Sequence, residues 1–87
     1  MSTVHIAGGP AKDELLSRML SNLPVTLLMT SGSVEVLIEE MQGTDESGVR
    51  FLFFGQIVAG TDAGARVEGH YDCLRKNGTL AISIDDA

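Results

Sequence analysis

Basic residues and long apolar runs are both scarce in this chain. Six Lys and Arg stand against twelve Asp and Glu, which gives a formal net charge of −6. Nucleic-acid binding depends on clustered cations that neutralise phosphates, so this balance argues against a nucleic-acid partner. It argues equally against an anionic membrane surface. No stretch approaches the roughly 20 apolar residues of a membrane span, so no membrane association is predicted.

Cysteine and large aromatic residues are scarce as well. The single Cys73 has no partner for an internal disulfide, and the N-terminus lacks the basic and apolar segments of a signal peptide. We therefore expect a cytoplasmic chain, where thiols stay reduced. With no Trp, one Tyr and three Phe, the core is expected to be mostly aliphatic. A chain of 87 residues has room for one domain, 1–87, around one core.

Helical spacing of apolar residues is present near the N-terminus. Residues 1–9 are predicted to form an arm that ends in two glycines, and residues 10–23 a helix. Pro10 suits the first helical position, while Asn22 and Pro24 end the helix. The apolar stripe of this helix comprises Leu15, Leu16, Met19, Leu20 and Leu23.

Period-two alternation replaces the helical pattern over residues 24–85. Short turns separate the alternating runs, and the Asn-Gly pair at 77–78 is a strong hairpin signal. The pattern predicts five antiparallel strands near 25–30, 33–41, 49–58, 65–75 and 79–85. The expected fold class is therefore α+β, an N-terminal helix packed on a five-stranded antiparallel meander, which could curl into a small Sm- or SH3-like barrel.

One strand register keeps the apolar residues on one face of this sheet. It places Phe53 opposite Tyr71, and Gly55 opposite Gly69, with the helix stripe as the cover of that face. The residues predicted to be buried are Leu16, Leu20, Ile38, Phe51, Phe53, Tyr71 and Ile82.

The stretch "VEGHYDC" at 67–73 carries residue types that hydrolases and metal sites use. In the predicted register Cys73 points inward and His70 outward, so the two cannot form a thiolate–imidazole dyad. Glu68, His70 and Asp72 share the outer face along a line, whereas metal ligands converge on a point. No catalytic residue, metal or cofactor is therefore predicted, and an enzyme using His70 and Asp72 at a subunit interface remains an alternative.

The outer face of the central strands is unusually apolar. Leu37 is predicted to pair with Leu52 beside Phe54, and we call these three residues the outer patch. Leu28 and Val58 extend it. The polar rim is predicted to comprise Glu35, Glu39, Glu68, His70 and Asp72, with Glu39 opposite Arg50. An apolar centre with a polar rim is typical of an interaction surface.

Two coverings of the outer patch are compatible with the sequence. One is a protein partner or a second copy of the chain, as in a homodimer. The other is the N-terminal arm, whose Val4 and Ile6 would lie over the patch if the sheet curls.

Three functions follow from these features. The first is a small non-catalytic interaction or regulatory protein, an inhibitor or assembly subunit, that acts through the outer patch. The second is a small-ligand module with a pocket between helix and sheet, near Gly55 and Gly69, and the third is the enzyme using His70 and Asp72.

In its order of elements, a helix followed by five antiparallel strands, the chain resembles the Sm-like small barrels. Its acidity is more similar to the small inhibitors of the termination factor Rho than to the RNA-binding members.

Overall fold

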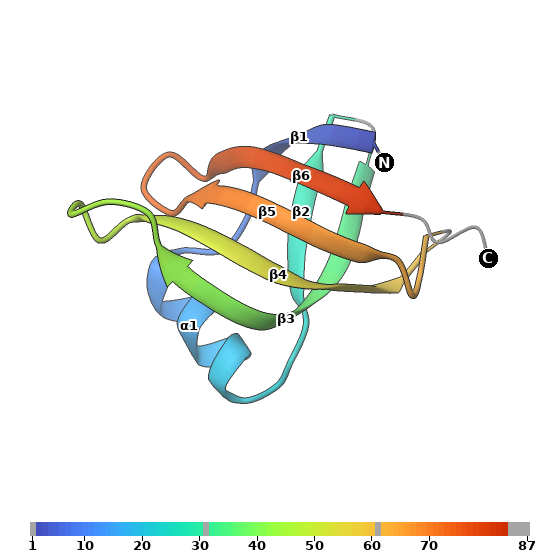
Figure 1. Cartoon of the computed structure of the whole chain (residues 1–87), viewed down its shortest axis with the longest axis horizontal. Helices are drawn as coiled ribbons and strands as arrows, with labels where there is room; N and C mark the ends of the chain where they lie inside the picture. Colours follow the sequence, from blue (N-terminus) through green and yellow to red (C-terminus); the bar gives the residue numbers. More distant parts are fainter. Residues whose placement is uncertain (1, 31, 61, 84–87) are drawn as a thin grey trace.

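The chain closes on itself as a small antiparallel barrel. The computed structural model describes residues 2–30, 32–60 and 62–83. In this part the elements follow the order β1 (Ser2–Gly8), α1 (Lys12–Leu20), β2 (Val25–Met29), β3 (Gly32–Gly43), β4 (Arg50–Ala59), β5 (Arg66–Asp72) and β6 (Asn77–Ser83). Each strand pairs with the next, and β1 pairs with β6 (Figure 1). The expected curling into a barrel is confirmed, but the sheet has six strands rather than five.

The N-terminal segment is a strand and not the arm predicted over residues 1–9. Val4 lies opposite Leu80 of β6, and Ile6 lies opposite Gly78 of the same strand. Ile6 also pairs with Met29 on β2. A five-stranded sheet would leave one edge of β2 and one edge of β6 with unpaired N–H and C=O groups. β1 occupies both edges, which is the physical reason that the sheet closes.

The helix α1 is shorter than the predicted range 10–23. Pro10 does not occupy the first helical position but precedes the N-cap residue Ala11. The predicted stop at Asn22 is confirmed, because this residue takes the left-handed conformation with φ of 59°. The Leu23 N–H then donates to the Arg18 carbonyl oxygen over 2.8 Å, which satisfies a free carbonyl at the helix end.

The helix covers much less of the sheet than its apolar stripe predicts. Leu15 is buried and Leu16 partly buried, but Leu20 is 80% exposed. The barrel wall encloses its own inner face, and α1 packs mainly against β2 and β3 (Figure 1). The predicted burial of Leu20 is therefore wrong. Within the described residues no helix is long and apolar enough to cross a membrane.

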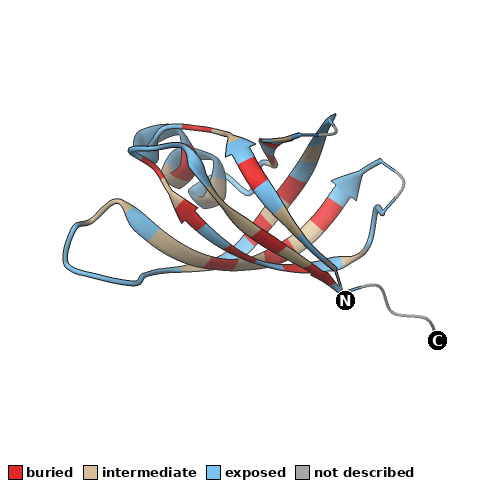
Figure 2. Cartoon of the chain, turned by 90° about the horizontal axis from the view of Figure 1, so that it is seen from above, coloured by how far each residue is buried: buried red, intermediate tan, exposed pale blue. Residues whose placement is uncertain are grey.

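The core fills the interior of the barrel, where buried residues alternate with exposed ones along the strands (Figure 2). Predicted burial is confirmed for Ile38, Phe53, Tyr71 and Ile82, whereas Phe51 is only partly buried. Among the described residues, the buried hydrophobic side chains of the core are Ile6, Leu15, Val25, Leu27, Val36, Ile38, Phe53, Ile57, Val67, Tyr71, Cys73, Leu80 and Ile82.

Most hairpin partners differ from the predicted register by even steps; the exceptions lie on β3 before Val36 and beyond Ile38, where the register shifts and the difference becomes odd. Tyr71 lies opposite Phe51 rather than Phe53, and Val36 lies opposite Val25 rather than Leu27. A slip of two residues changes the partner of a side chain but not the face on which it lies. The inner and outer sets of β5 were therefore predicted correctly with the wrong neighbours.

The β5–β6 turn lies before the Asn-Gly pair that was predicted to form it. Asn77 is the first residue of β6, and the turn occupies residues 73–76. Lys76 has a φ of 57°, and its N–H donates to the Asp72 carbonyl oxygen over 2.7 Å. Lys76 thus takes the left-handed turn position that the sequence pattern assigned to Asn77-Gly78.

The two glycines predicted to face one another are not partners. Gly55 lies opposite Val67, and Gly69 lies opposite Phe53. The Phe53 ring occupies the space where a side chain at position 69 would be. Gly69 is therefore required by close packing rather than by an open gap between facing glycines.

Candidate functional site

The outer face of β4 carries the apolar centre of the candidate interaction surface. Leu52 and Phe54 are two residues apart, so both side chains project from the same face of the strand. On β5, His70 lies opposite Leu52 and Glu68 opposite Phe54. The centre of the patch is therefore an apolar stripe along one strand with polar residues beside it.

The third member of the outer patch is placed differently from the prediction. Leu37 lies opposite Gln56 and not opposite Leu52. The register of β3 shifts between Ile38 and Glu40, where the irregularity moves the rest of the strand relative to β4. The structure therefore brings Leu52 and Phe54 together. It places Leu37 beside Gln56, the polar residue that follows them on the outer face of β4.

The outer patch is partly exposed, and the N-terminal segment does not cover it. Leu37, Leu52 and Phe54 are each partly buried, while the predicted extensions Val58 and Leu28 are 40% and 51% exposed. The alternative in which the N-terminal residues lie over the patch is wrong, because β1 forms the barrel wall between β2 and β6. Large apolar residues that are exposed elsewhere are Leu20, Leu23 and Leu74.

One acidic member of the predicted rim pairs with a different arginine. Arg66 Nη2 lies 2.8 Å from Glu39 Oε1, whereas Glu39 was expected opposite Arg50. Because Arg66 pairs with Gln56 and Gln56 with Leu37, this ion pair reaches across β4 at one end of the patch. Both side chains are largely exposed, so the pair contributes at most about 1 kcal/mol.

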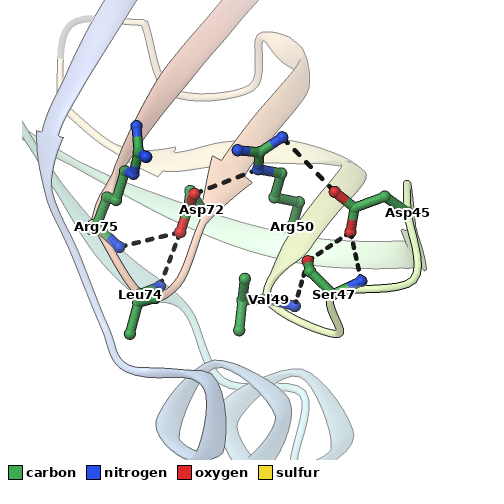
Figure 3. A network of polar contacts seen from close by, with 7 residues as sticks. All are labelled: Asp45, Ser47, Val49, Arg50, Asp72, Leu74 and Arg75. Atoms are coloured by element: carbon green, nitrogen blue, oxygen red, sulfur yellow. Dashed lines mark hydrogen bonds and ion pairs between the residues drawn. The ribbon is translucent and has the colours of Figure 1, made fainter.

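Asp72, another predicted rim residue, organises the turn at the end of β5 (Figure 3). Its Oδ1 accepts hydrogen bonds from the backbone N–H groups of Leu74 at 2.9 Å and Arg75 at 3.0 Å. Its Oδ2 lies 3.4 Å from Arg50 Nε. The backbone donor of Arg75 has the largest effect in lowering the pKa of Asp72, and the Arg50 charge acts in the same direction. Asp72 is therefore an ionised carboxylate that stabilises a turn.

Asp45 in the β3–β4 loop extends this network and was not singled out from the sequence. Ser47 donates to its Oδ1 through the hydroxyl and through the backbone N–H at 2.9 Å, which lowers the pKa of Asp45. Arg50 Nη1 lies 3.6 Å from Asp45 Oδ2, so Arg50 is held between two carboxylates (Figure 3). The only sequence signal was a Ser two residues after an Asp, which is a common local turn pattern.

The remaining residues of "VEGHYDC" lie on the predicted faces. Cys73 is buried, while His70 is exposed on the outer face, as predicted. Burial raises the pKa of the Cys73 thiol, which disfavours the nucleophilic thiolate. Among residues 2–30, 32–60 and 62–83, no group of three or more His, Cys, Asp and Glu side chains is arranged to share a metal ion.

Glu35 of the predicted rim also lies on β3, before Glu39 along the strand. Glu35 is exposed, with Thr26 of β2 and Ala59 of β4 as its strand neighbours. Glu35 and Glu39 therefore place negative charge along β3, while His70 and Asp72 line the β5 side.

A hollow of about 260 Å³ lies between α1 and β2. Its lining residues are Gly9, Pro10, Glu14, Arg18, Val25, Thr26 and Leu28. The pocket predicted near Gly55 and Gly69 is a different place, and there the Phe53 ring fills the space beside Gly69.

Comparisons of the chain with protein-family models, with curated proteins and with solved structures found no match. A function for the chain therefore rests on the chemistry of its own surface.

Proposed function

We propose that the chain is a small non-catalytic interaction protein, a regulator, inhibitor or assembly subunit, that binds a protein through the outer patch. The observation that carries the proposal is the pair Leu52 and Phe54 on the outer face of a barrel whose interior is already filled. An antiparallel sheet with one solvated face normally places polar residues there. The hydrogen-bonded state of Asp72 supports a structural role for this carboxylate.

A second copy of the chain is the partner that we propose first. A standard interface buries about 800 Å² per partner, which is about 15% of the 5276 Å² surface of this chain. The apolar stripe is only one strand wide, so a contact of that size includes rim residues on β3 and β5. Glu35, Glu39 and Asp72 would then approach their counterparts on the second copy.

The charge of the chain determines how such a dimer responds to salt. Each copy carries a formal charge of −6, so two copies repel one another at low ionic strength. Added salt screens this repulsion, while it leaves the burial of apolar surface intact or strengthens it. The dimer is therefore expected to tighten as ionic strength rises, which is opposite to a contact held by salt bridges.

The experiment compares two substitutions that add the same charge. Phe54→Glu places a carboxylate in the centre of the outer patch, and Leu74→Glu places one on a side chain that is 77% exposed in the β5–β6 turn. By light scattering at micromolar concentration, the parent and Leu74→Glu should be dimers and Phe54→Glu a monomer. All three should have the same circular dichroism, because neither site belongs to the buried core.

A parent that is monomeric at every salt concentration would refute the homodimer. Equal dissociation of Phe54→Glu and Leu74→Glu would show that added charge, and not the outer patch, controls association.

A further inference from the structure

A second hollow lies where the β3–β4 loop meets the β5–β6 turn. Its volume is about 270 Å³, and Arg50, Arg75, Asn77 and His70 contribute to its lining. This volume is slightly below the usual range of ligand cavities, so a ligand would be smaller than a typical drug-sized molecule. Two arginines at one small hollow are unexpected in a chain with twice as many acidic as basic residues.

Among the described residues, some of the basic side chains form ion pairs and others do not. Arg18 and Arg66 form ion pairs elsewhere on the surface. Lys12, Arg75 and Lys76 belong to none of the ion pairs found among residues 2–30, 32–60 and 62–83. Of these three, Arg75 lines the hollow, and Lys76 follows it in the same turn. Arg75 therefore adds to the hollow a positive charge that is in no ion pair with the described carboxylates.

A single carboxylate, that of Asp72, contacts both arginines of the hollow. Asp72 Oδ1 accepts the backbone N–H of Arg75, which holds the turn, and Oδ2 lies 3.4 Å from Arg50 Nε. Asp45 contacts Arg50 Nη1 from the other side at 3.6 Å. In Figure 3 the two guanidinium groups stand on either side of the Asp72 carboxylate. Arg50 is thus held in place before any ligand binds, which reduces the entropy lost on binding.

The polar groups of the hollow favour a singly charged planar anion. Arg50 Nη2 takes part in no ion pair or hydrogen bond found among the described residues. Arg75 and Asn77 line the same hollow, and their side chains carry further N–H donors. A carboxylate matches the spacing of guanidinium donors and accepts two parallel hydrogen bonds. The nearby Asp45 and Asp72, together with the net charge of the chain, disfavour a dianion such as phosphate.

The geometry points to a binding site for the carboxylate group of a compact organic acid, held by Arg75, Arg50 and Asn77. The carboxylate belongs either to a free small acid or to the C-terminus of a peptide, and both present the same group to the hollow. The site is separate from the apolar stripe of the outer patch, although His70 and Asp72 border both.

Titration of the ¹⁵N-labelled chain with sodium benzoate tests the site by nuclear magnetic resonance. The Arg75, Asn77 and Arg50 signals should shift and saturate. Arg75→Gln should weaken binding by about tenfold or more, because a hydrogen bond to a charged group is worth about 1.5–3 kcal/mol. Arg18→Gln is the matched control, since it removes the same charge from α1 and should bind benzoate as the parent does.

Two further probes separate the ligand classes. Inorganic phosphate should bind at least tenfold more weakly than benzoate. If the natural group is the carboxylate of a chain end, a short peptide should bind through its free C-terminus and lose binding when that C-terminus is amidated. If benzoate binds more tightly than the peptide, the natural ligand is a free acid.

Three results would overturn the site. These are shifts that do not saturate, equal affinity of Arg75→Gln and Arg18→Gln for benzoate, and phosphate binding as tightly as benzoate. The nuclear magnetic resonance titration reports on individual residues, whereas light scattering reports the mass of the assembly. A failure of the titration would therefore leave the test of the homodimer unaffected.

Discussion

Replacing Gly69 by alanine should destabilise the barrel through a clash with one aromatic ring. Gly69 is buried in β5 opposite Phe53, which is 1% exposed. A Cβ at position 69 would lie 2.8 Å from Phe53 Cε1 and closer still to two other atoms of the ring. Because the ring is enclosed by the core, it cannot move aside without displacing its neighbours.

The magnitude follows from two opposing effects. Overpacking a core site costs about 1–3 kcal/mol, whereas alanine in a strand interior normally gains roughly 0.5–1 kcal/mol over glycine. We therefore expect a net loss of about 1 kcal/mol in the free energy of unfolding. For a domain of this size such a loss lowers the Tm by roughly 4–8 °C.

The control is a second glycine in the same barrel. At Gly43 a Cβ would meet nothing closer than the Asp45 carbonyl oxygen at 4.0 Å, so Gly43→Ala should stay within about 0.5 kcal/mol of the parent. Urea unfolding followed by circular dichroism measures both variants. Adding Phe53→Leu to Gly69→Ala should cost at least about 1 kcal/mol less than the sum of the single changes, because the clashing ring is gone. Additive costs, or equal stability of the two alanine variants, would show that the ring does not limit position 69.

Other substitutions test separate parts of the fold. Tyr71→Phe removes the hydrogen bond from the buried hydroxyl to the Pro10 carbonyl oxygen at 2.7 Å and should cost about 1–3 kcal/mol in urea unfolding. Burial raises the pKa of Tyr71 from 10.0 to about 12, so the parent should lose stability as pH rises from 10 toward 12, and Tyr71→Phe should lack this loss. Asn22→Ala should lower the stability by about 1 kcal/mol, and Asn22→Gly should not, because only the former strains the left-handed φ of 59°. His70→Ala should stay within about 0.5 kcal/mol of the parent, and equimolar zinc should leave the Tm unchanged; a zinc-induced rise that His70→Ala abolishes would reveal a metal site.

Local periodicity is enough to predict on which face most strand residues lie. Successive side chains in a strand point to opposite faces, so alternation assigned Phe53 and Tyr71 to the core and His70 to the outside. The same alternation placed Leu52 and Phe54 together on the outer face of one strand. None of these assignments depends on which strand is the neighbour.

Pairing between strands could not be predicted, because slips of two residues leave every face unchanged. The pairing of Leu37 with Leu52 failed for this reason and because the strand is irregular after Ile38. The same limit concealed the arrangement of Arg50 between Asp45 and Asp72, since these residues come from a loop, β4 and β5. Bulges and turn positions are set by contacts across the sheet and not by the residues alone.

The sequence by itself determined a chain of alternating strands, an apolar interior and an acidic surface. Only the tertiary structure decided that residues 2–8 join the sheet and that α1 covers little of it. Read locally, Val4 and Ile6 sit in a segment too short to distinguish a strand from an arm. That segment becomes a strand because β2 and β6 each present an unpaired edge to it. The β2 edge comes from residues at least 20 positions away, and the β6 edge from residues more than 70 positions away.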